Sequence, residues 1–124
     1  MSRSRAVLVT AALAAGVLAA CNSADKPATS TMGNAELGKE AIEKYGCGSC
    51  HTIPGVKEAD GLVGPPLTHF AERSFIAGQL ANTEENLTRW IRDPQAVEPG
   101  TAMPNLGVSD TDAQNIAAYI TTIE

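Results

Sequence analysis

Apolar residues recur at helical spacing in several stretches of the chain. The longest stretch follows Ser109, which together with Asp112 forms a variant of the capping box that starts many helices. Its apolar positions lie three or four residues apart, at Ala113, Ile116, Ala117, Ile120 and Ile123. No stretch alternates apolar and polar residues over a useful strand length. The pattern therefore predicts an all-α fold.

Two further helices are expected earlier in the chain. From Ala35 onward an apolar face is opposed by a charged one, and Gly46 ends this helix. The second helix begins after Thr83, a favourable N-cap. It ends at Asp93-Pro94, because the residue before a proline avoids the helical conformation. The apolar face of this second helix consists of Leu87, Trp90 and Ile91.

Glycine and proline separate these helices. Both residue types gather in 52–66 and again in 95–108, and such clusters indicate loops rather than regular elements. Between the two loops a short helix is expected over 67–77, with Phe70 and Ile76 facing inward. The expected domain is thus a set of short helices joined by long, proline-rich connections.

The first 20 residues have the pattern of a secretory signal peptide. Arg3 and Arg5 precede an apolar run that is too short and too rich in alanine to span a membrane. The end of this leader resembles a bacterial lipobox, in which cleavage before Cys21 leaves a lipid-bearing cysteine at the N-terminus. Ordinary cleavage after Ala20 would leave an unpaired thiol in an oxidising compartment, which is unfavourable. We therefore expect a lipid anchor at Cys21.

Small polar residues follow the leader, so 21–34 is expected to be a lipidated cysteine and a flexible tether, and 35–124 a single domain. Without the leader the 9 basic residues fall to 7 against 14 acidic ones, giving a formal charge of −7. A negative charge of this size argues against nucleic acid as a partner and against a polybasic membrane patch.

The most specific chemical motif is the run Cys-Gly-Ser-Cys-His at 47–51. Two thiols separated by two residues, with a histidine directly after the second, are the attachment pattern of a c-type haem. One turn of backbone can present the sulfurs of Cys47 and Cys50 to the two vinyl groups at one porphyrin edge. His51 then faces the iron from the proximal side. The sequence predicts one covalently bound haem c.

Two other interpretations of these thiols fit the sequence less well. A redox-active Cys-x-x-Cys is typical of a βαβ context, which the flanking residues do not offer. A structural zinc site needs four ligands, and only His69 and Cys21 would remain to complete it. Haem attachment is the interpretation that the spacing favours.

A second axial ligand is expected from the loop between Pro99 and Pro104, where Met103 offers a thioether. A soft sulfur ligand stabilises ferrous iron and raises the reduction potential relative to two histidines. Met103 could instead be an ordinary apolar contact. His69 is the rival ligand, and it would give a lower potential.

Five short motifs carry a family resemblance: Cys47-x-x-Cys50-His51, Gly64-Pro65-x-Leu67, Trp90-Ile91-x-Asp93-Pro94, Pro99-Gly100-Thr101-x-Met103-Pro104 and Ile116-Ala117-Ala118-Tyr119-Ile120. Their order and spacing resemble the class I c-type cytochromes over nearly all of 35–124. The stretch 70–103 is most similar to the cytochrome c domain fused to subunit II of some bacterial haem-copper oxidases. The resemblance implies three to five short helices wrapped around one covalently bound haem.

The resemblance also implies roles for individual residues. The Pro65 carbonyl would accept the Nδ1 hydrogen of His51 and fix the imidazole. Arg73 would meet a haem propionate, and Trp90 would pack against the porphyrin on the Met103 side. The residues alone leave ordinary alternatives open, with Pro65 as a loop breaker, Arg73 as a solvated residue and Trp90 as plain core.

Gly38 lies inside the first expected helix, where glycine costs about 1 kcal/mol relative to alanine. The resemblance implies that Gly38 and Ile42 cross the last helix near Ile116 and Tyr119, so that close backbone approach offsets this cost. The alternative is that Gly38 is a tolerated weak point.

A haem with both axial positions filled has no open site for a substrate, so the sequence predicts an electron carrier and not an enzyme. We expect a monomeric, membrane-tethered, monohaem cytochrome at the outer face of the cytoplasmic membrane or in the periplasm. Its partners would be respiratory redox proteins, such as a quinol-cytochrome c reductase and a terminal oxidase. The alternatives are a haem subunit of a larger oxidase or dehydrogenase complex, and a haem enzyme or sensor with a labile methionine ligand.

Docking to such partners is expected through a small patch of little charge at the porphyrin edge. The residues expected in this patch are Cys50, Ile53, Ala102 and Pro104. Because the patch carries little charge, electron transfer should depend weakly on ionic strength.

Overall fold

The computed structural model describes residues 33–124, so the expected signal peptide, Cys21 and the tether up to residue 32 lie outside the described residues. Within the described part the α-helices (α), 3-10 turns (η) and strands (β) follow in the order α1 (Ala35–Lys44), η1 (Cys47–Ser49), η2 (Phe70–Glu72), β1 (Phe75–Ile76), β2 (Leu80–Ala81), α2 (Glu84–Arg92), α3 (Pro94–Val97) and α4 (Asp110–Ile120). The predicted all-α fold of three to five short helices is confirmed as a mainly helical domain with four α-helices in the described residues, to which the short pair β1 and β2 is added.

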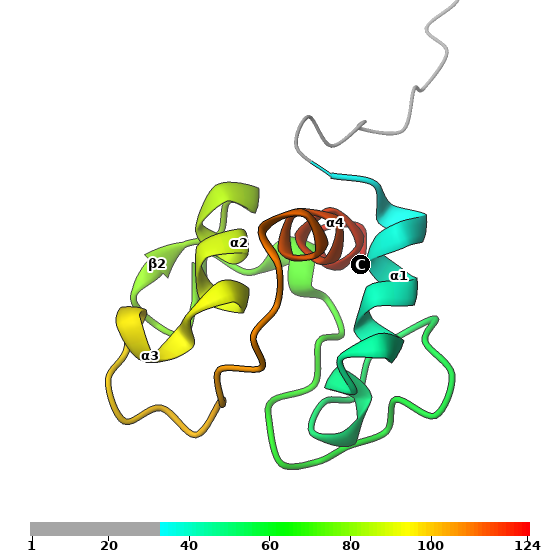
Figure 1. The fold of residues 1–124 in the computed structure, drawn as a ribbon, viewed down its shortest axis with the longest axis horizontal. Helices are drawn as coiled ribbons and strands as arrows, with labels where there is room; N and C mark the ends of the chain where they lie inside the picture. The colour runs from blue at the N-terminus through cyan, green and yellow to red at the C-terminus, as the bar shows by residue number, and fades with distance from the viewer. Residues whose placement is uncertain (1–32) are drawn as a thin grey trace, which may run out of the picture.

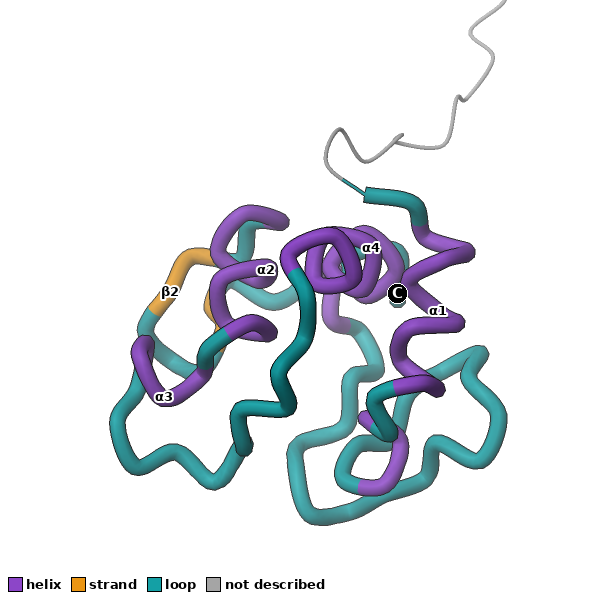
Figure 2. Tube along the Cα trace, in the orientation of Figure 1, coloured by secondary structure: helices purple, strands orange, loops and turns teal. Residues whose placement is uncertain are grey.

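Helix α4 lies between α1 and α2 and packs against both (Figure 1). The loops 50–69 and 98–109 extend from the same side of this helical layer, below α4 in Figure 2. Buried apolar residues of the helices and of the loops form one core cluster. The fold therefore consists of a helical layer, formed by α1, α2 and α4, and a loop layer, formed by 50–69 and 98–109.

Helix α1 starts at a well-capped N-terminus. The Asn34 side chain accepts a hydrogen bond from the Leu37 amide at 3.1 Å, as an N-cap does. The Asn34 amide in turn donates to Oδ1 of Asn115 in α4 at 2.8 Å. At the other end Gly46 has a φ of 69°, the left-handed conformation in which helices commonly end. Both ends of α1 are thus set by local residues, and its start is tied to α4.

The crossing of α1 and α4 depends on Gly38. A Cβ at this position would lie 1.9 Å from the carbonyl oxygen of Asn115 and 3.0 Å from Cβ of Tyr119. One turn later Ile42 is 0% exposed. The close approach expected at Gly38 is therefore confirmed, and it brings the helix backbones together where a larger residue would not fit.

Two predicted N-caps are also confirmed. The Thr83 hydroxyl accepts from the Asn86 amide at the start of α2, and the Ser109 hydroxyl accepts from the Asp112 amide at the start of α4, each at 3.2 Å. The apolar positions predicted for this helix are buried, four of them within α4 and one, Ile123, three residues beyond its end. The four are Ala113, Ile116, Ala117 and Ile120.

The loop expected over 95–108 begins later than predicted, because a short helix occupies its first residues. Residues Pro94–Val97 form α3, because the Asp93 side chain accepts from the Ala96 amide at 3.2 Å. Pro94 occupies the first turn, where its missing N–H removes no helical hydrogen bond. Asp93 thus ends α2 and starts α3 at the same point.

The helix expected over 67–77 is wrong. This segment holds only the turn η2 and then strand β1, which pairs antiparallel with β2. Ala77 and Gly78 have φ values of 50° and 72°, so the chain reverses tightly between the strands. Asn82 stabilises the segment, since its Nδ2 donates to the carbonyls of Phe70 and Arg73 at 2.8 and 2.9 Å. Phe70 and Ile76 are nevertheless buried, as the sequence analysis expected.

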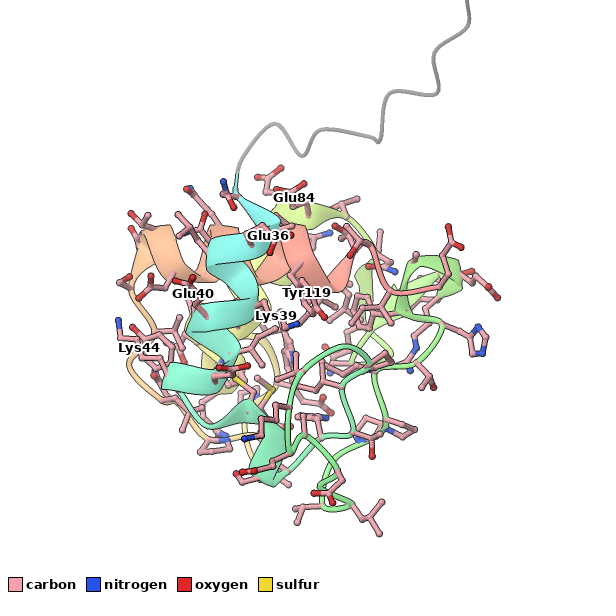
Figure 3. All side chains as sticks on the ribbon, turned by 90° about the vertical axis from the view of Figure 1, so that its right-hand side faces the viewer. Glu36, Lys39, Glu40, Lys44, Glu84 and Tyr119 are labelled. Atoms are coloured by element: carbon pink, nitrogen blue, oxygen red, sulfur yellow. The ribbon has the colours of Figure 1, made fainter. Side chains whose placement is uncertain are left out.

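The charged face expected for the first helix is turned to solvent. Figure 3 shows Glu36, Lys39, Glu40 and Lys44 on the outer side of α1. Across residues 33–124, every helix is either too short or too polar to cross a bilayer.

Candidate functional site

An apolar cavity of about 320 Å³ lies between the helical layer and the loop layer. Its lining comes from the segment around His51, from α2, from the loop around Met103 and, in α4, from Ile116 and Ile120. Arg73 and Glu98 bring charged side chains to a lining that is otherwise mainly apolar. A cavity of this size and character is typical of sites for small molecules or cofactors, which occupy about 300–1,000 Å³.

One wall of the cavity carries both thiols of the Cys-x-x-Cys-His motif. The chain leaves α1 at Gly46 and turns at once into η1. The amides of Cys50 and His51 both donate to the Cys47 carbonyl, at 3.2 and 3.1 Å. This single turn brings Cys47, Cys50 and His51 into the lining. The arrangement matches the prediction that one turn presents two sulfurs and an imidazole together.

Burial governs the chemistry of the first thiol. Desolvation raises the pKa of Cys47 above its ordinary value, and the neighbouring Cys50 adds a smaller increase. A thiol with a raised pKa is a poor thiolate nucleophile, whereas redox-active cysteines have a lowered pKa. Cys47 and Cys50 form no disulfide. The raised pKa of Cys47 disfavours a redox-active Cys-x-x-Cys.

The imidazole of His51 has a fixed orientation. Its Nδ1 lies 2.7 Å from the carbonyl oxygen of Pro65, the contact that the family resemblance implied. A carbonyl only accepts, so Nδ1 carries the hydrogen and Nε2 keeps a free lone pair. Gly64 makes room for the ring, because a Cβ there would lie 2.3 Å from Cε1 of His51. His51 therefore has only Nε2 left as a nitrogen that could hold a metal.

The opposite wall is formed by α2 and the loop that follows α3. Trp90 and Met103 both line the cavity from this side, and each side chain is half-buried. Arg73 lines it as well, with Nη2 donating to the carbonyls of Pro66 and Thr68. The structure therefore brings together all of the site residues predicted within the domain: Cys47, Cys50, His51, Pro65, Arg73, Trp90 and Met103.

His69, the rival ligand, does not line the cavity. Its side chain is 70% exposed and lies 3.4 Å from the carboxylate of Glu72. Its φ of 53° directs the chain into η2. Among residues 33–124 no group of three or more His, Cys, Asp or Glu side chains is arranged to hold a metal ion. The zinc interpretation therefore has no support in the described part of the chain.

The apolar patch expected at the cavity edge needs one correction. Ile53 is only 2% exposed and belongs to the core, while Ala102 and Pro104 are exposed. Sequence reasoning missed three exposed apolar side chains that line the cavity opening: Val63 at 78%, Phe75 at 61% and Leu106 at 43%. We call Val63, Phe75 and Leu106 the apolar rim. The pattern Gly61-Leu62-Val63-Gly64, with apolar residues between glycines in a loop, was the available signal for part of it.

Side-chain hydrogen bonds also hold the loop layer and the end of α1 against α4. Tyr119 of α4 donates from Oη to the Pro54 carbonyl at 2.8 Å. Lys44 Nζ and Tyr45 Oη both donate to Oδ2 of Asp112, each at 2.9 Å. The bond from Lys44, followed by the one from Tyr45, lowers the pKa of Asp112. The same contact raises the pKa of Lys44. The end of α1 that leads into the motif is thereby held against α4.

Comparisons with known proteins identify the family to which the chain belongs. The model of the cytochrome c family matches residues 35–124. Cytochrome c-550 of Nitrobacter winogradskyi is 32% identical over 105 residues, which cover 74% of this chain and 93% of that protein.

Two oxidase subunits are also similar. Cytochrome c oxidase subunit 2 of Alkalihalophilus pseudofirmus is 38% identical over 97 residues, covering 77% of this chain and 27% of that protein. The subunit of the same name from Bacillus subtilis is 35% identical over 85 residues, covering 64% of this chain and 24% of that protein. The chain thus spans about a quarter of the length of these relatives.

Members of the matched family are typically extracytoplasmic electron-transfer proteins with covalently bound haem c, and the free Cys47 and Cys50 at the cavity wall are consistent with that attachment. The chain therefore belongs to the cytochrome c family, and part of it is related to oxidase subunit 2.

Proposed function

We propose that the protein binds one haem c through Cys47 and Cys50, with His51 and Met103 as axial ligands, and transfers single electrons between respiratory partners. The observation that carries the proposal is the cavity itself. Two thiols and an imidazole lie on one wall, and a thioether lies on the other. Two sulfurs for the vinyl groups, one nitrogen ligand and one soft sulfur ligand are the donor set that a six-coordinate haem c requires.

The haem supplies an iron that changes between two oxidation states. The chain's residues keep the surroundings of that iron constant. Pro65 holds the imidazole of His51, and the loop around Met103 supplies the thioether, so no coordination position is left for a substrate. Apolar lining residues such as Ile116 and Ile120 exclude water from the site. These features favour electron transfer over substrate chemistry.

Arg73 and Trp90 complete the proposed site. Two bonds from Nη2 of Arg73 to the carbonyls of Pro66 and Thr68 fix the guanidinium at the cavity, and its other N–H groups remain for an anion. We assign them to a haem propionate, because a charge-assisted hydrogen bond reduces the cost of burying that carboxylate. Trp90 is assigned to the porphyrin face on the Met103 side, where a large apolar ring excludes water.

The apolar rim supports docking of a redox partner at the cavity opening. Val63, Phe75 and Leu106 are exposed and uncharged, so a partner can approach without strong electrostatic steering. We propose a terminal oxidase as the acceptor, because two relatives named cytochrome c oxidase subunit 2 are similar to this chain. A rate of oxidase reduction that falls steeply with ionic strength would contradict docking through the rim.

A second candidate is a subunit of a larger oxidase complex. It is favoured by the oxidase relatives, of which this chain covers only 27% and 24%. Purification of the membrane-bound protein under mild detergent separates the two cases. Release of the cytochrome alone supports a carrier, and stoichiometric co-purification with oxidase subunits supports a complex.

The axial ligands are tested by optical spectroscopy and potentiometry of the matured protein. Replacing Met103→Ala should abolish the far-red band of ferric iron bound to methionine and lower the reduction potential, because a soft ligand is lost. The control His69→Ala should leave both unchanged, since His69 lies away from the cavity. A Met103→Ala protein with the spectrum and potential of the wild type would refute the ligand assignment. High-spin ferric iron in the wild type would instead support an enzyme or sensor.

The anchor is tested separately. We propose that Cys21 is lipidated and that residues 22–34 tether the domain to the membrane. Two or more acyl chains hold a protein on a bilayer stably, whereas one does not. Cys21→Ser should therefore release the cytochrome into the soluble extracytoplasmic fraction. Retention of the variant on the membrane would contradict lipidation.

A further inference from the structure

The side chain of Gln95 makes three hydrogen bonds to the backbone of the loop that carries Met103. Its Nε2 donates to the carbonyl oxygens of Thr101 and Met103, at 2.8 and 3.1 Å. Its Oε1 accepts from the amide of Gly100 at 3.1 Å. One exposed side chain thus contacts three of the four residues 100–103, of which Thr101 and Met103 line the cavity.

The chemistry of the partners fixes the orientation of this amide group. The Gly100 amide can only donate, and the two carbonyls can only accept. Glutamine offers one acceptor and two N–H donors at the end of a flexible side chain, so it satisfies all three. A glutamate at the same place could keep the bond from Gly100, but it would face the two carbonyls without a hydrogen to donate.

The backbone of Gln95 belongs to a capped and partly buried helix. It lies in α3, which begins at the Asp93 cap, and the neighbouring Pro94 is fully buried. The loop beyond α3 has no regular secondary structure up to α4. Gly100 has a φ of 88°, a conformation that the loop needs to reverse toward the cavity. Gln95 therefore connects the capped helix α3 to an irregular loop.

We propose that Gln95 is a positioning residue for the axial ligand Met103. By holding the carbonyls of Thr101 and Met103, it fixes the backbone from which the thioether reaches into the cavity. The inference rests on the proposed function, in which Met103 binds the iron. It predicts that loss of the Gln95 contacts leaves the haem attached but makes the thioether easier to displace.

The test is an imidazole titration of the ferric holoprotein, because imidazole binds ferric iron only when it displaces the thioether. Gln95→Ala should bind imidazole about tenfold more tightly than the wild type, as expected from the loss of these hydrogen bonds. Gln95→Glu should also bind imidazole more tightly than the wild type. This second variant keeps the test possible if Gln95→Ala is poorly produced. The matched control is Gln79→Ala, an exposed glutamine in the turn between β1 and β2, which should titrate as the wild type does.

A second readout separates positioning from general stability. Exchange of the Gly100 amide hydrogen, followed by NMR in the reduced protein, should quicken in Gln95→Ala and stay closer to the wild type in Gln95→Glu. Exchange in α1 and α4 should not change in either variant.

Each outcome has a defined meaning. Wild-type imidazole affinity in both Gln95 variants would overturn the proposal, and so would faster exchange throughout α1 and α4. A wild-type protein without the far-red band of bound methionine would refute the proposed ligand set before any Gln95 variant is made. Failure of the inference and failure of the proposed function are therefore distinguishable.

Discussion

In the helical layer, side chains such as Ile42 and Ile116 are almost completely buried. The loop layer contributes fewer residues to that core, Ile53 among them, and side-chain hydrogen bonds hold its backbone as well. The hydrogen bonds join His51 to the Pro65 carbonyl, Tyr119 to the Pro54 carbonyl, and Gln95 to the loop around Met103. The two layers thus differ in what maintains them. Packing sets the stability of the helical layer, and individual polar contacts set the geometry of the loops that carry the site.

The comparison predicts that changes in the helical layer alter stability and changes in the loop layer alter the site. Four substitutions test this separation, and they are ordered by the size of the expected effect.

The largest effect is expected for Gly38→Ala. Helix propensity alone predicts that alanine stabilises α1 by about 1 kcal/mol. The Cβ would lie 1.9 Å from the Asn115 carbonyl oxygen, and forcing the helices apart costs about 3 kcal/mol. Chemical unfolding of the holoprotein should therefore show a net destabilisation, with the far-red band of the folded state unchanged. The control Glu40→Ala, at an exposed position of α1, should stay within about 0.5 kcal/mol of the wild type. A stabilised Gly38→Ala protein would show that the helices do not cross as described.

Gly64→Ala should disturb the site more than the fold. The new Cβ would lie 2.3 Å from Cε1 of His51, so the imidazole must turn away from Pro65. Such crowding costs about 1–3 kcal/mol, and here it acts on the orientation of a proposed ligand. The reduction potential should shift, while helix content by circular dichroism stays constant. Gly107→Ala is the control, since its φ of 67° makes alanine strained but no other group lies near. Equal potentials in Gly64→Ala and the wild type would contradict the proposed role of His51.

Tyr119→Phe removes a contact between the layers. The lost bond from Oη to the Pro54 carbonyl should cost about 1 kcal/mol in unfolding free energy. Hydrogen exchange should quicken at the amide of Val56, two residues after Pro54, and remain slow in α4. An unfolding free energy equal to that of the wild type would mean that the two layers do not depend on this bond.

The smallest effect concerns pH. The hydrogen bond from Lys44 lowers the pKa of Asp112 below its ordinary value of 3.8. A lowered folded-state pKa contributes stability that is fully present above the unfolded-state pKa and is lost as the pH falls through the folded-state value. At pH 7 the melting temperature of the wild type should be slightly higher than that of Asp112→Asn. This difference should shrink as the pH is lowered from 5 into the acid range. A difference that does not vary with pH over this range would contradict a charged Asp112.

The sequence predicted what is local. Thr83 and Ser109 were identified as N-caps because their partners lie three residues away. The spacing of Cys47, Cys50 and His51 likewise predicted that one turn of backbone brings the three side chains to one side. The close approach at Gly38 is a contact with a separate segment, and it was predicted because the family resemblance implied it.

What the sequence did not predict depends on contacts between separate segments. The hairpin after Phe70 forms where a helix was expected, and Asn82 reaches back twelve residues to hold it. The contacts of Gln95 with the loop around Met103 have no periodicity that a pattern could reveal. The exposure of Phe75 at the apolar rim was not predicted, because it follows from that unexpected hairpin.

The central claim is that Cys47 and Cys50 attach one haem c between His51 and Met103. The most direct measurement is the intact mass of the matured, unfolded protein, combined with alkylation of its free thiols. The account predicts a polypeptide heavier by one haem, in which Cys47 and Cys50 resist alkylation. A polypeptide of unchanged mass, with both of these thiols alkylated, would contradict it.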